Sequence, residues 1–208
     1  MENLLDLYRL PYDPRFPLVC MDEACKQLIA EIKKPLPVRE GQPAIYDYEY
    51  ERKGVCNLIV FVEPLRGWRK VFVRSRRTML DWAECVRTIL DDFYPDATLV
   101  RLVLDNLNTH TLASLYEAFA PAEARRLARR LDLHFTPKHG SWLNMAETEI
   151  GILTGQCLDR RIDQTEVLCR EVSAWENDRN DAKATINWRF TIADARVKLK
   201  NIYPSIKT

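Results

Sequence analysis

The chain has 208 residues, of which 47% are hydrophobic and 29% charged, and its formal net charge is +1. This length and composition are typical of one globular domain, and the small net charge argues against a strongly basic protein that binds nucleic acid nonspecifically. The sequence has no apolar run long enough to span a membrane and no secretory leader, so we expect a cytoplasmic protein.

The first predicted strand ends on a carboxylate. The apolar run at residues 18–21 has the length and branching of a buried strand, and Asp22 follows it directly. Burying an unpaired carboxylate is strongly unfavourable, so we expect Asp22 to be paired or bound to a metal ion. Residues 31–42 hold lysines, prolines and a glycine, which is typical of a loop.

A hairpin and then a helix are predicted next, each delimited by turn or cap residues. Aromatic and charged residues alternate at 46–52, just ahead of the hairpin. The expected elements are a strand at 55–62 opened by Gly54, a turn at 64–67, a strand at 68–73, and a helix from the Thr78 cap to Phe93.

A second carboxylate closes another apolar run. Residues 99–104 are typical of a buried strand, and Asp105 follows them. Between Asp105 and Glu147 we expect a helix at 122–131 and a short strand at 133–135.

The third carboxylate lies on a predicted helix whose apolar residues recur with helical spacing. Glu147 falls on the same face as Leu143 and Ile150, whereas Glu149 points away from that face. We therefore expect Glu147 to face inward and Glu149 not to. The alternative is that Asn144 caps the helix and Glu147 only completes a capping box.

Together the three carboxylates predict a divalent-metal site. Asp22, Asp105 and Glu147 come from two strands and a helix, so they can meet at the carboxyl edge of a sheet, where ligand sites gather. Mg²⁺ prefers oxygen ligands and is usually held by one or two carboxylates together with substrate phosphates. Three carboxylates can hold two such ions, which would activate an attacking water or 3′-hydroxyl and stabilise the leaving oxygen of a phosphodiester.

Basic residues form two clusters in the sequence. The first suits phosphate contacts as well as it suits a solvated surface, whereas the second is more typical of a solvated surface. Lys138 and His139 precede Glu147 and are expected near the scissile backbone. His110 either supports the acidic site or makes a structural hydrogen bond. The first cluster comprises Arg66, Arg69, Lys70, Arg74, Arg76 and Arg77, and the second comprises Arg125, Arg126, Arg129 and Arg130.

Four long strings resemble the catalytic domain of bacterial insertion-sequence transposases of the mariner superfamily. They are VCMDEA, LDNLNTHTLASLYEAF, FTPKHGSWLNMAETE and WRFTIADARVKLKNIYP, and the shorter string DYEYERKG ahead of the hairpin is similar as well. The resemblance implies an α/β protein with the ribonuclease H-like fold, in which helices flank a mixed central sheet. It also implies a DDE triad at Asp22, Asp105 and Glu147, and two Mg²⁺ ions that Mn²⁺ can replace.

The resemblance further implies partners and supporting residues. Cut-and-paste transposition requires DNA as partner, both the transposon ends and a target at TA, and a homodimer to hold two ends. The residues expected to contact DNA are Arg74, Arg76, Arg77, Lys138 and His139. Asn106 and Asn144, each beside an acidic motif, are expected to support the carboxylates. The spacer between Asp105 and Glu147 is longer than is usual in the better-known eukaryotic branches of the superfamily, so the third acid is placed by the string SWLNMAE and not by counting residues.

We expect three segments: a residual linker at 1–16, the catalytic domain at 17–180 and a tail at 181–208. On this interpretation a separate helix-turn-helix polypeptide supplies recognition of the transposon ends. Two alternatives remain open. One is a truncated, noncatalytic remnant that binds DNA or full-length transposase as a regulator, and the other is a structure-selective nuclease on the same fold.

Overall fold

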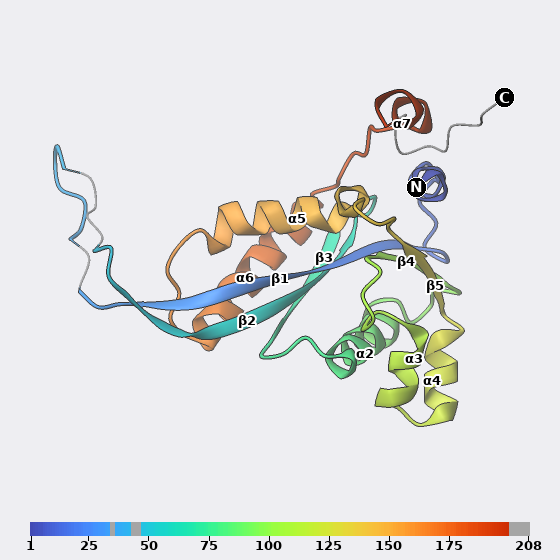
Figure 1. Ribbon diagram of the computed structural model, residues 1–208, viewed down its shortest axis with the longest axis horizontal. Coiled ribbons are helices and arrows are strands. Elements are labelled where there is room, and N and C mark those ends of the chain that lie inside the picture. The colour runs from blue at the N-terminus through green and yellow to red at the C-terminus, as the bar shows by residue number, and fades with distance from the viewer. Residues whose placement is uncertain (34–35, 43–46, 200–208) are drawn as a thin grey trace.

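A mixed five-stranded sheet with the order β3-β2-β1-β4-β5 organises the chain. The computed structural model describes residues 1–33, 36–42 and 47–199, so Lys34, Pro35 and Tyr46 of the predicted segments and residues 200–208 of the predicted tail lie outside it. β2 runs antiparallel to both of its neighbours, β1 and β3, and β4 and β5 run parallel to β1 (Figure 1). The strands are β1 (Leu18–Glu31), β2 (Tyr50–Glu63), β3 (Trp68–Arg74), β4 (Val100–Leu104) and β5 (Leu131–Phe135).

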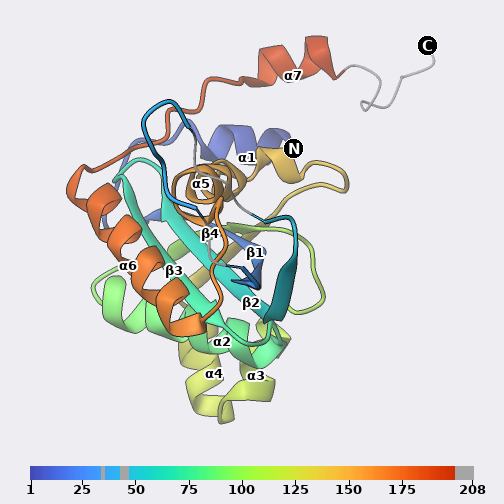
Figure 2. The same ribbon diagram turned by 90° about the vertical axis from the view of Figure 1, so that its left-hand side faces the viewer.

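Helices cover both faces of this sheet, with α2, α3 and α4 on one face and α5 and α6 on the other (Figure 2). No helix among the described residues is long and apolar enough to cross a membrane. The α-helices are α1 (Glu2–Leu7), α2 (Met79–Thr88), α3 (Leu112–Ala118), α4 (Pro121–Ala128), α5 (Met145–Leu153), α6 (Thr165–Asp181) and α7 (Ile192–Lys198). Single turns of other helix types add η1 (Ile89–Phe93), η2 (Ser141–Leu143) and η3 (Thr154–Leu158).

Strand β1 supplies apolar side chains to both faces. Val19 and Met21 belong to the core under α2, while Leu18 and Cys20 belong to the core that includes the start of α5. This alternation follows from the pleat of a strand. It means that Asp22 and Glu23, which come next, leave β1 toward opposite faces.

Two predicted strands are longer in the structure than expected. β1 does not end at Asp22 but continues to Glu31, and β2 begins at Tyr50 instead of after Gly54. These extensions pair with each other as an antiparallel ribbon whose β2 side is exposed, so backbone pairing continues where burial has stopped. An apolar pattern reports burial and therefore misses such a ribbon. Gly54, at φ 122°, lies where the register shifts at a bulge, a backbone conformation open to glycine.

The other predicted elements around the sheet are present, with one change of bounds and one omission. The helix predicted at 122–131 is α4, which ends at Ala128, and Leu131 already begins β5. The turn at 64–67 and the strand after it are present, and Thr78 caps α2 in a capping box with Asp81. The predicted helix to Phe93 is α2 followed by the π-helical turn η1. Helix α3 is not predicted from the sequence because its seven residues bury only Ser114 and Leu115, too few to show a period.

The two ends of the described chain pack against each other. Leu4, Leu5 and Tyr8 of the first segment are buried, and Ala195 of α7 is buried in the same core. The ring of Trp188 meets that of Tyr8 edge-on with centroids 5.2 Å apart. Residues within the segments predicted as linker and tail thus contribute to the hydrophobic core.

Candidate active site

Asp22 and Asp105 lie side by side where β1 and β4 part. The parallel register pairs Cys20 with Val103 as its last match, and each aspartate comes two residues after its member of that pair. The sequence predicts Asp22 at the end of its strand. In the structure the strand continues, and Asp22 lies just beyond the end of the pairing between β1 and β4. Asp105 directly follows the last residue of β4, as predicted.

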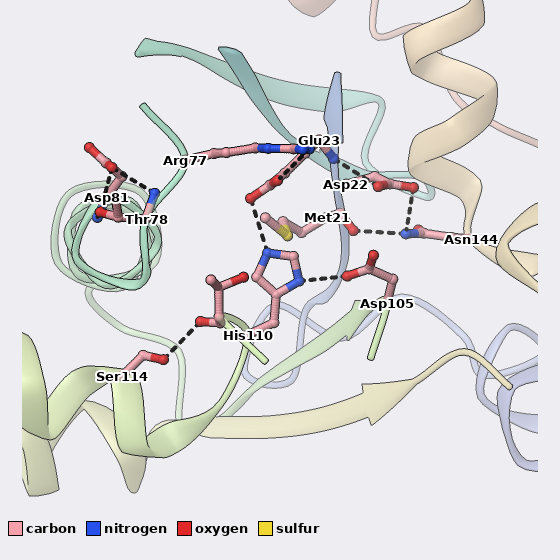
Figure 3. Close-up of polar contacts among 11 residues, drawn as sticks. Met21, Asp22, Glu23, Arg77, Thr78, Asp81, Asp105, His110, Ser114 and Asn144 are labelled. Carbon is pink, nitrogen blue, oxygen red and sulfur yellow. Dashed lines mark hydrogen bonds and ion pairs between the residues drawn. The ribbon is translucent and has the colours of Figure 1, made fainter. Parts of the chain in front are cut away.

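Asn144 ties the start of α5 to the backbone of β1 beside Asp22. Its amide nitrogen donates to the Met21 carbonyl at 2.7 Å and to Oδ2 of Asp22 at 3.4 Å (Figure 3). Its Oδ1 accepts the N–H of Ala146 at 3.1 Å, so Asn144 caps the helix as predicted. The backbone N–H of Asn144 donates to the carbonyl of Ser141, which means that it does not form the second half of a capping box with Glu147. The half-buried Glu147 side chain therefore has no capping role at the start of α5.

The charges of the other two predicted acids act on the Asp22 carboxyl. Burial raises the pKa of Asp22 to about 6, and the negative charges of Asp105 and Glu147 add to the rise, while a hydrogen bond from the N–H of Glu23 opposes it. Within the described part of the chain, however, no three His, Cys, Asp or Glu side chains are already arranged to hold a metal ion. The carboxylates are neighbours but not a closed cluster.

The raised pKa of Asp22 predicts a pH-dependent gain in stability for Asp22→Asn without metal. The pKa of Asp22 in the folded protein, about 6, exceeds the ordinary value of 3.8. Wild-type stability therefore falls as pH rises from about 4 to 6, because Asp22 ionises in the unfolded chain before it ionises in the folded one. Asp22→Asn has no carboxyl group to ionise at this position, so it does not lose stability over this pH range. Allowing for partial exposure, it should gain on the order of 2 kcal/mol at pH 7 and nothing below about pH 4. Urea unfolding in EDTA across this range measures the difference, and a pH-independent difference would contradict the assignment.

His110 bridges Asp105 and Glu23. Its Nδ1 lies 2.6 Å from Oδ1 of Asp105 and its Nε2 lies 3.1 Å from Oε1 of Glu23. Burial opposes protonation of the imidazole, but the hydrogen bonds to the two carboxylates outweigh it and raise the pKa of His110 to about 9. The ring is therefore an imidazolium at neutral pH, with both nitrogens donating. Of the two roles left open by the sequence, the structure gives His110 a direct contact with the acidic site.

Sequence reasoning missed Glu23. An acid that follows another acid in a strand points to the opposite face and usually meets solvent. Here that face is covered, and only 5% of the Glu23 side chain is exposed. The partner that identifies it, His110, lies 87 residues away in the sequence, so no local pattern could have found the pair.

The prediction that Glu149 points away from the interior is wrong. Glu149 is fully buried and pairs with Arg69 at 2.9 Å and with Arg179 at 2.7 Å. Helix α5 packs on the sheet along one side and meets Arg179 of α6 on another, so more than one of its faces is inside. Arg69 is likewise fully buried, which removes it from the set of predicted phosphate contacts.

The remaining basic residues divide into exposed and paired groups. Arg76, Arg77, Lys138 and His139 are exposed, and Arg74 is half-buried with its guanidinium carbon 5.5 Å from the ring centre of Phe72. Asn106 is exposed in the loop after β4. In the second cluster, Arg126 pairs with Asp91 and Glu123, and Arg130 pairs with Asp91, as expected for a solvated surface. In the first, Lys70 pairs with Glu176 and Arg66 lies 3.6 Å from Glu63.

Comparison with known proteins gives one family and a set of similar folds. The family model described as DDE superfamily endonuclease matches residues 17–169. Among curated proteins, none matches the chain.

Solved structures of mariner proteins share the fold at low identity. A Mos1 mariner paired end complex with Mn has 17% identity and a TM-score of 0.59, and the match covers 88% of this chain and 54% of that one. A pre-cleavage Mos1 transpososome has 15% identity and a TM-score of 0.55, covering 90% and 61%. The catalytic domain of Mos1 mariner transposase has 11% identity and a TM-score of 0.54, covering 90% and 91%. The chain thus spans little more than half of the longer Mos1 chains.

Proposed function

Because the chain belongs to the DDE superfamily endonucleases and has the ribonuclease H-like fold, we propose that it is a transposase catalytic domain that cuts DNA strands and joins the 3′ ends to target DNA. The observation that carries this proposal is the meeting of Asp22 and Asp105 where β1 and β4 part, with Glu147 on α5 close enough to raise the pKa of Asp22.

The donor set fits Mg²⁺. Asp22, Asp105 and Glu147 offer carboxylate oxygens only, the ligands that Mg²⁺ prefers, and their mutual repulsion in a partly buried site is relieved by a cation. The absence of a closed three-ligand cluster within the described residues is compatible with Mg²⁺, which keeps several waters and is completed by substrate phosphates. We propose that these acids hold two Mg²⁺ ions, replaceable by Mn²⁺, which would supply activation of the attacking oxygen and stabilisation of the leaving oxygen.

The other proposed residues act on the DNA or on the acids. Asn144 holds Asp22 and the first turn of α5 together, which fixes Glu147 relative to the sheet. Arg74, Arg76, Arg77, Lys138 and His139 are proposed to contact the DNA backbone, and Asn106 is proposed to act near Asp105.

The wider assembly is proposed on the resemblance to mariner transposases. Two copies would act together because two transposon ends must be held, and the target would be a TA dinucleotide. Recognition of the ends would come from a separate helix-turn-helix polypeptide. The solved neighbours include a paired end complex and a strand transfer complex, which supports an assembly of this kind.

Incubation with labelled DNA in Mg²⁺ or Mn²⁺ tests the proposal. One substrate carries uncut transposon ends and the other carries precut 3′ ends, and Asp105→Ala protein is the control. Nicking of the first and joining of the second, both lost in the control, are the expected result. Nicking without joining would indicate a structure-selective nuclease. Binding without either reaction, with and without an added helix-turn-helix domain, would indicate a noncatalytic regulator.

Removing exposed arginines should weaken DNA binding in a salt-dependent way. Arg76→Ala is expected to reduce the slope of log K against log salt concentration by about 1, because one phosphate contact is lost. Arg77→Ala is expected to act in the same direction, although Arg77 also lies 3.8 Å from Glu23. Fluorescence anisotropy with a labelled duplex measures the slope. Arg126→Ala is the matched control, since Arg126 is already paired with Asp91 and Glu123. An equal change in that control would contradict the assignment.

A further inference from the structure

We propose that His110, backed by Glu23, is a positioning residue that sets the orientation of the Asp105 carboxylate for metal binding. This inference rests on the proposed function, because it concerns how the same acidic site is held in shape. Neither residue needs to touch DNA or metal in order to act in this way.

The contact with Asp105 is short and one-sided. His110 donates to Oδ1 of Asp105 at 2.6 Å, which is short for a charge-assisted hydrogen bond from nitrogen. Figure 3 shows the ring on one side of Asp105, with Asp22 and Asn144 on the other side. Holding Oδ1 from the ring side leaves Oδ2 as the oxygen that this contact does not use. His110 thus fixes which edge of the carboxylate can face the site.

The ring itself is held firmly. It is fully buried, its second nitrogen is bound by Glu23, and its centroid lies 5.9 Å from that of the Trp82 ring. The loop that carries it is closed by the His110 N–H donating to the Leu107 carbonyl at 3.0 Å. With both nitrogens engaged, the ring cannot rotate without breaking a hydrogen bond to a carboxylate.

The main polar contact of the Glu23 carboxylate is with His110. Its Oε1 accepts from His110, while its buried Oε2 has no hydrogen-bond partner among the described residues. The nearest cation to that oxygen is Arg77, at 3.8 Å, whose side chain is 64% exposed. A buried carboxylate with one donor is costly to keep, so its geometry points to a role in fixing the imidazole. Hydrogen-bond partners of metal-binding groups orient them in this way, and their loss commonly weakens metal binding 10- to 100-fold.

Two amide variants separate the two hydrogen bonds. In His110→Asn the amide nitrogen occupies roughly the place of Nδ1 and can donate to Asp105, but it cannot reach Glu23. In His110→Gln the longer side chain can reach Glu23 but loses the place of Nδ1. Each variant loses one hydrogen bond to a carboxylate, so a merely structural role predicts similar effects of both. A positioning role predicts that only the Gln variant loses its hold on Asp105.

Calorimetric titration of the whole chain with Mn²⁺ is the test, with urea unfolding in EDTA on the same samples. His110→Gln should bind Mn²⁺ at least about 10-fold more weakly than wild type, and His110→Asn should recover most of that loss. His134→Asn is the matched control, because His134 also pairs with an aspartate, but with Asp132 on the edge strand β5, which is not one of the three acids. It should bind Mn²⁺ like the wild type. In cleavage assays, the Mn²⁺ concentration for half-maximal rate should rise in the Gln variant.

The outcomes distinguish the inference from the proposed function. If wild type binds Mn²⁺ but His110→Gln binds it equally well, or if Asn and Gln variants lose affinity equally, the positioning role is overturned and the proposed function stands. If wild type neither binds Mn²⁺ nor cleaves DNA, the proposed function fails and the inference fails with it. Should the His110 variants not fold, Glu23→Ala decides, since it removes the acceptor that holds Nε2 and frees the ring to turn away from Asp105. It should weaken Mn²⁺ binding several-fold, and wild-type affinity in that variant would overturn the proposal.

Discussion

Asp105→Asn is expected to lower the rate of Mg²⁺-dependent strand cleavage by about three orders of magnitude, which corresponds to about 4 kcal/mol of transition-state stabilisation. The substitution keeps the shape of the side chain and an acceptor for His110 but removes the charge that a cation would bind. Asp22→Asn and Glu147→Gln should have comparable effects, and double variants should be little worse than single ones, because the acids act as a unit. Single-turnover cleavage of a labelled strand measures the rate.

The matched control for this prediction is Asp132→Asn. Asp132 also pairs with a histidine, His134, and its side chain is 42% exposed, so the change removes the same charge without touching the site. Its cleavage rate should be that of the wild type. If the control lost as much activity as Asp105→Asn, general charge and not the proposed triad would be responsible.

Glu149→Ala is expected to destabilise the fold by about 3–5 kcal/mol. It would leave the guanidinium of Arg69 buried without its counter-charge, and both side chains are fully buried. Arg179, 17% exposed, would lose its partner as well. Urea unfolding at neutral pH in EDTA measures the loss, and activity should fall only in proportion to the unfolded fraction.

Glu147→Ala provides the control from the same helix. Glu147 lies two residues before Glu149 but is only half-buried, and its charge is repelled by Asp22. Its removal should leave stability unchanged or raise it, while abolishing metal-dependent cleavage. The two neighbouring glutamates should therefore give opposite results in the two assays. Equal stability loss in both variants would show that α5 is sensitive to any change and that the ion pair has no special part.

The sequence was sufficient for the elements that are defined by burial. The apolar runs around Val60 and Val103 are strands, and Asp105 lies where the second of them ends. Asp22 was selected for its position after an apolar run, although the backbone continues as a strand beyond it. Asp22 is distinguished by lying just after the last residues that pair β1 with β4. Neither segment alone shows where this pairing ends, because the two strands are some 80 residues apart in the sequence.

The ion pairs between distant segments could not be predicted. Helical periodicity places Glu149 on the polar side of α5. That side is buried because Arg69 and Arg179, which belong to other elements, pack against it and pair with Glu149. The sequence likewise places Arg69 and Arg76 in one basic cluster. The Arg69 side chain is fully buried, whereas the Arg76 side chain is exposed. Periodicity describes a helix against one surface, whereas α5 is packed on more than one.

The packing of α1 against α7 has a consequence for the order in which the chain can mature during synthesis. A helix of six residues is too short to persist alone, so α1 depends on its docking partners. Some of those partners are among the last described residues, because Glu2 pairs with Arg196 across 194 positions of sequence. As chains fold while they emerge, the part of α1 that α7 covers stays uncovered until residues 192–198 have been made. This part of α1 is therefore open to aggregation for as long as the synthesis of the residues between α1 and α7 takes.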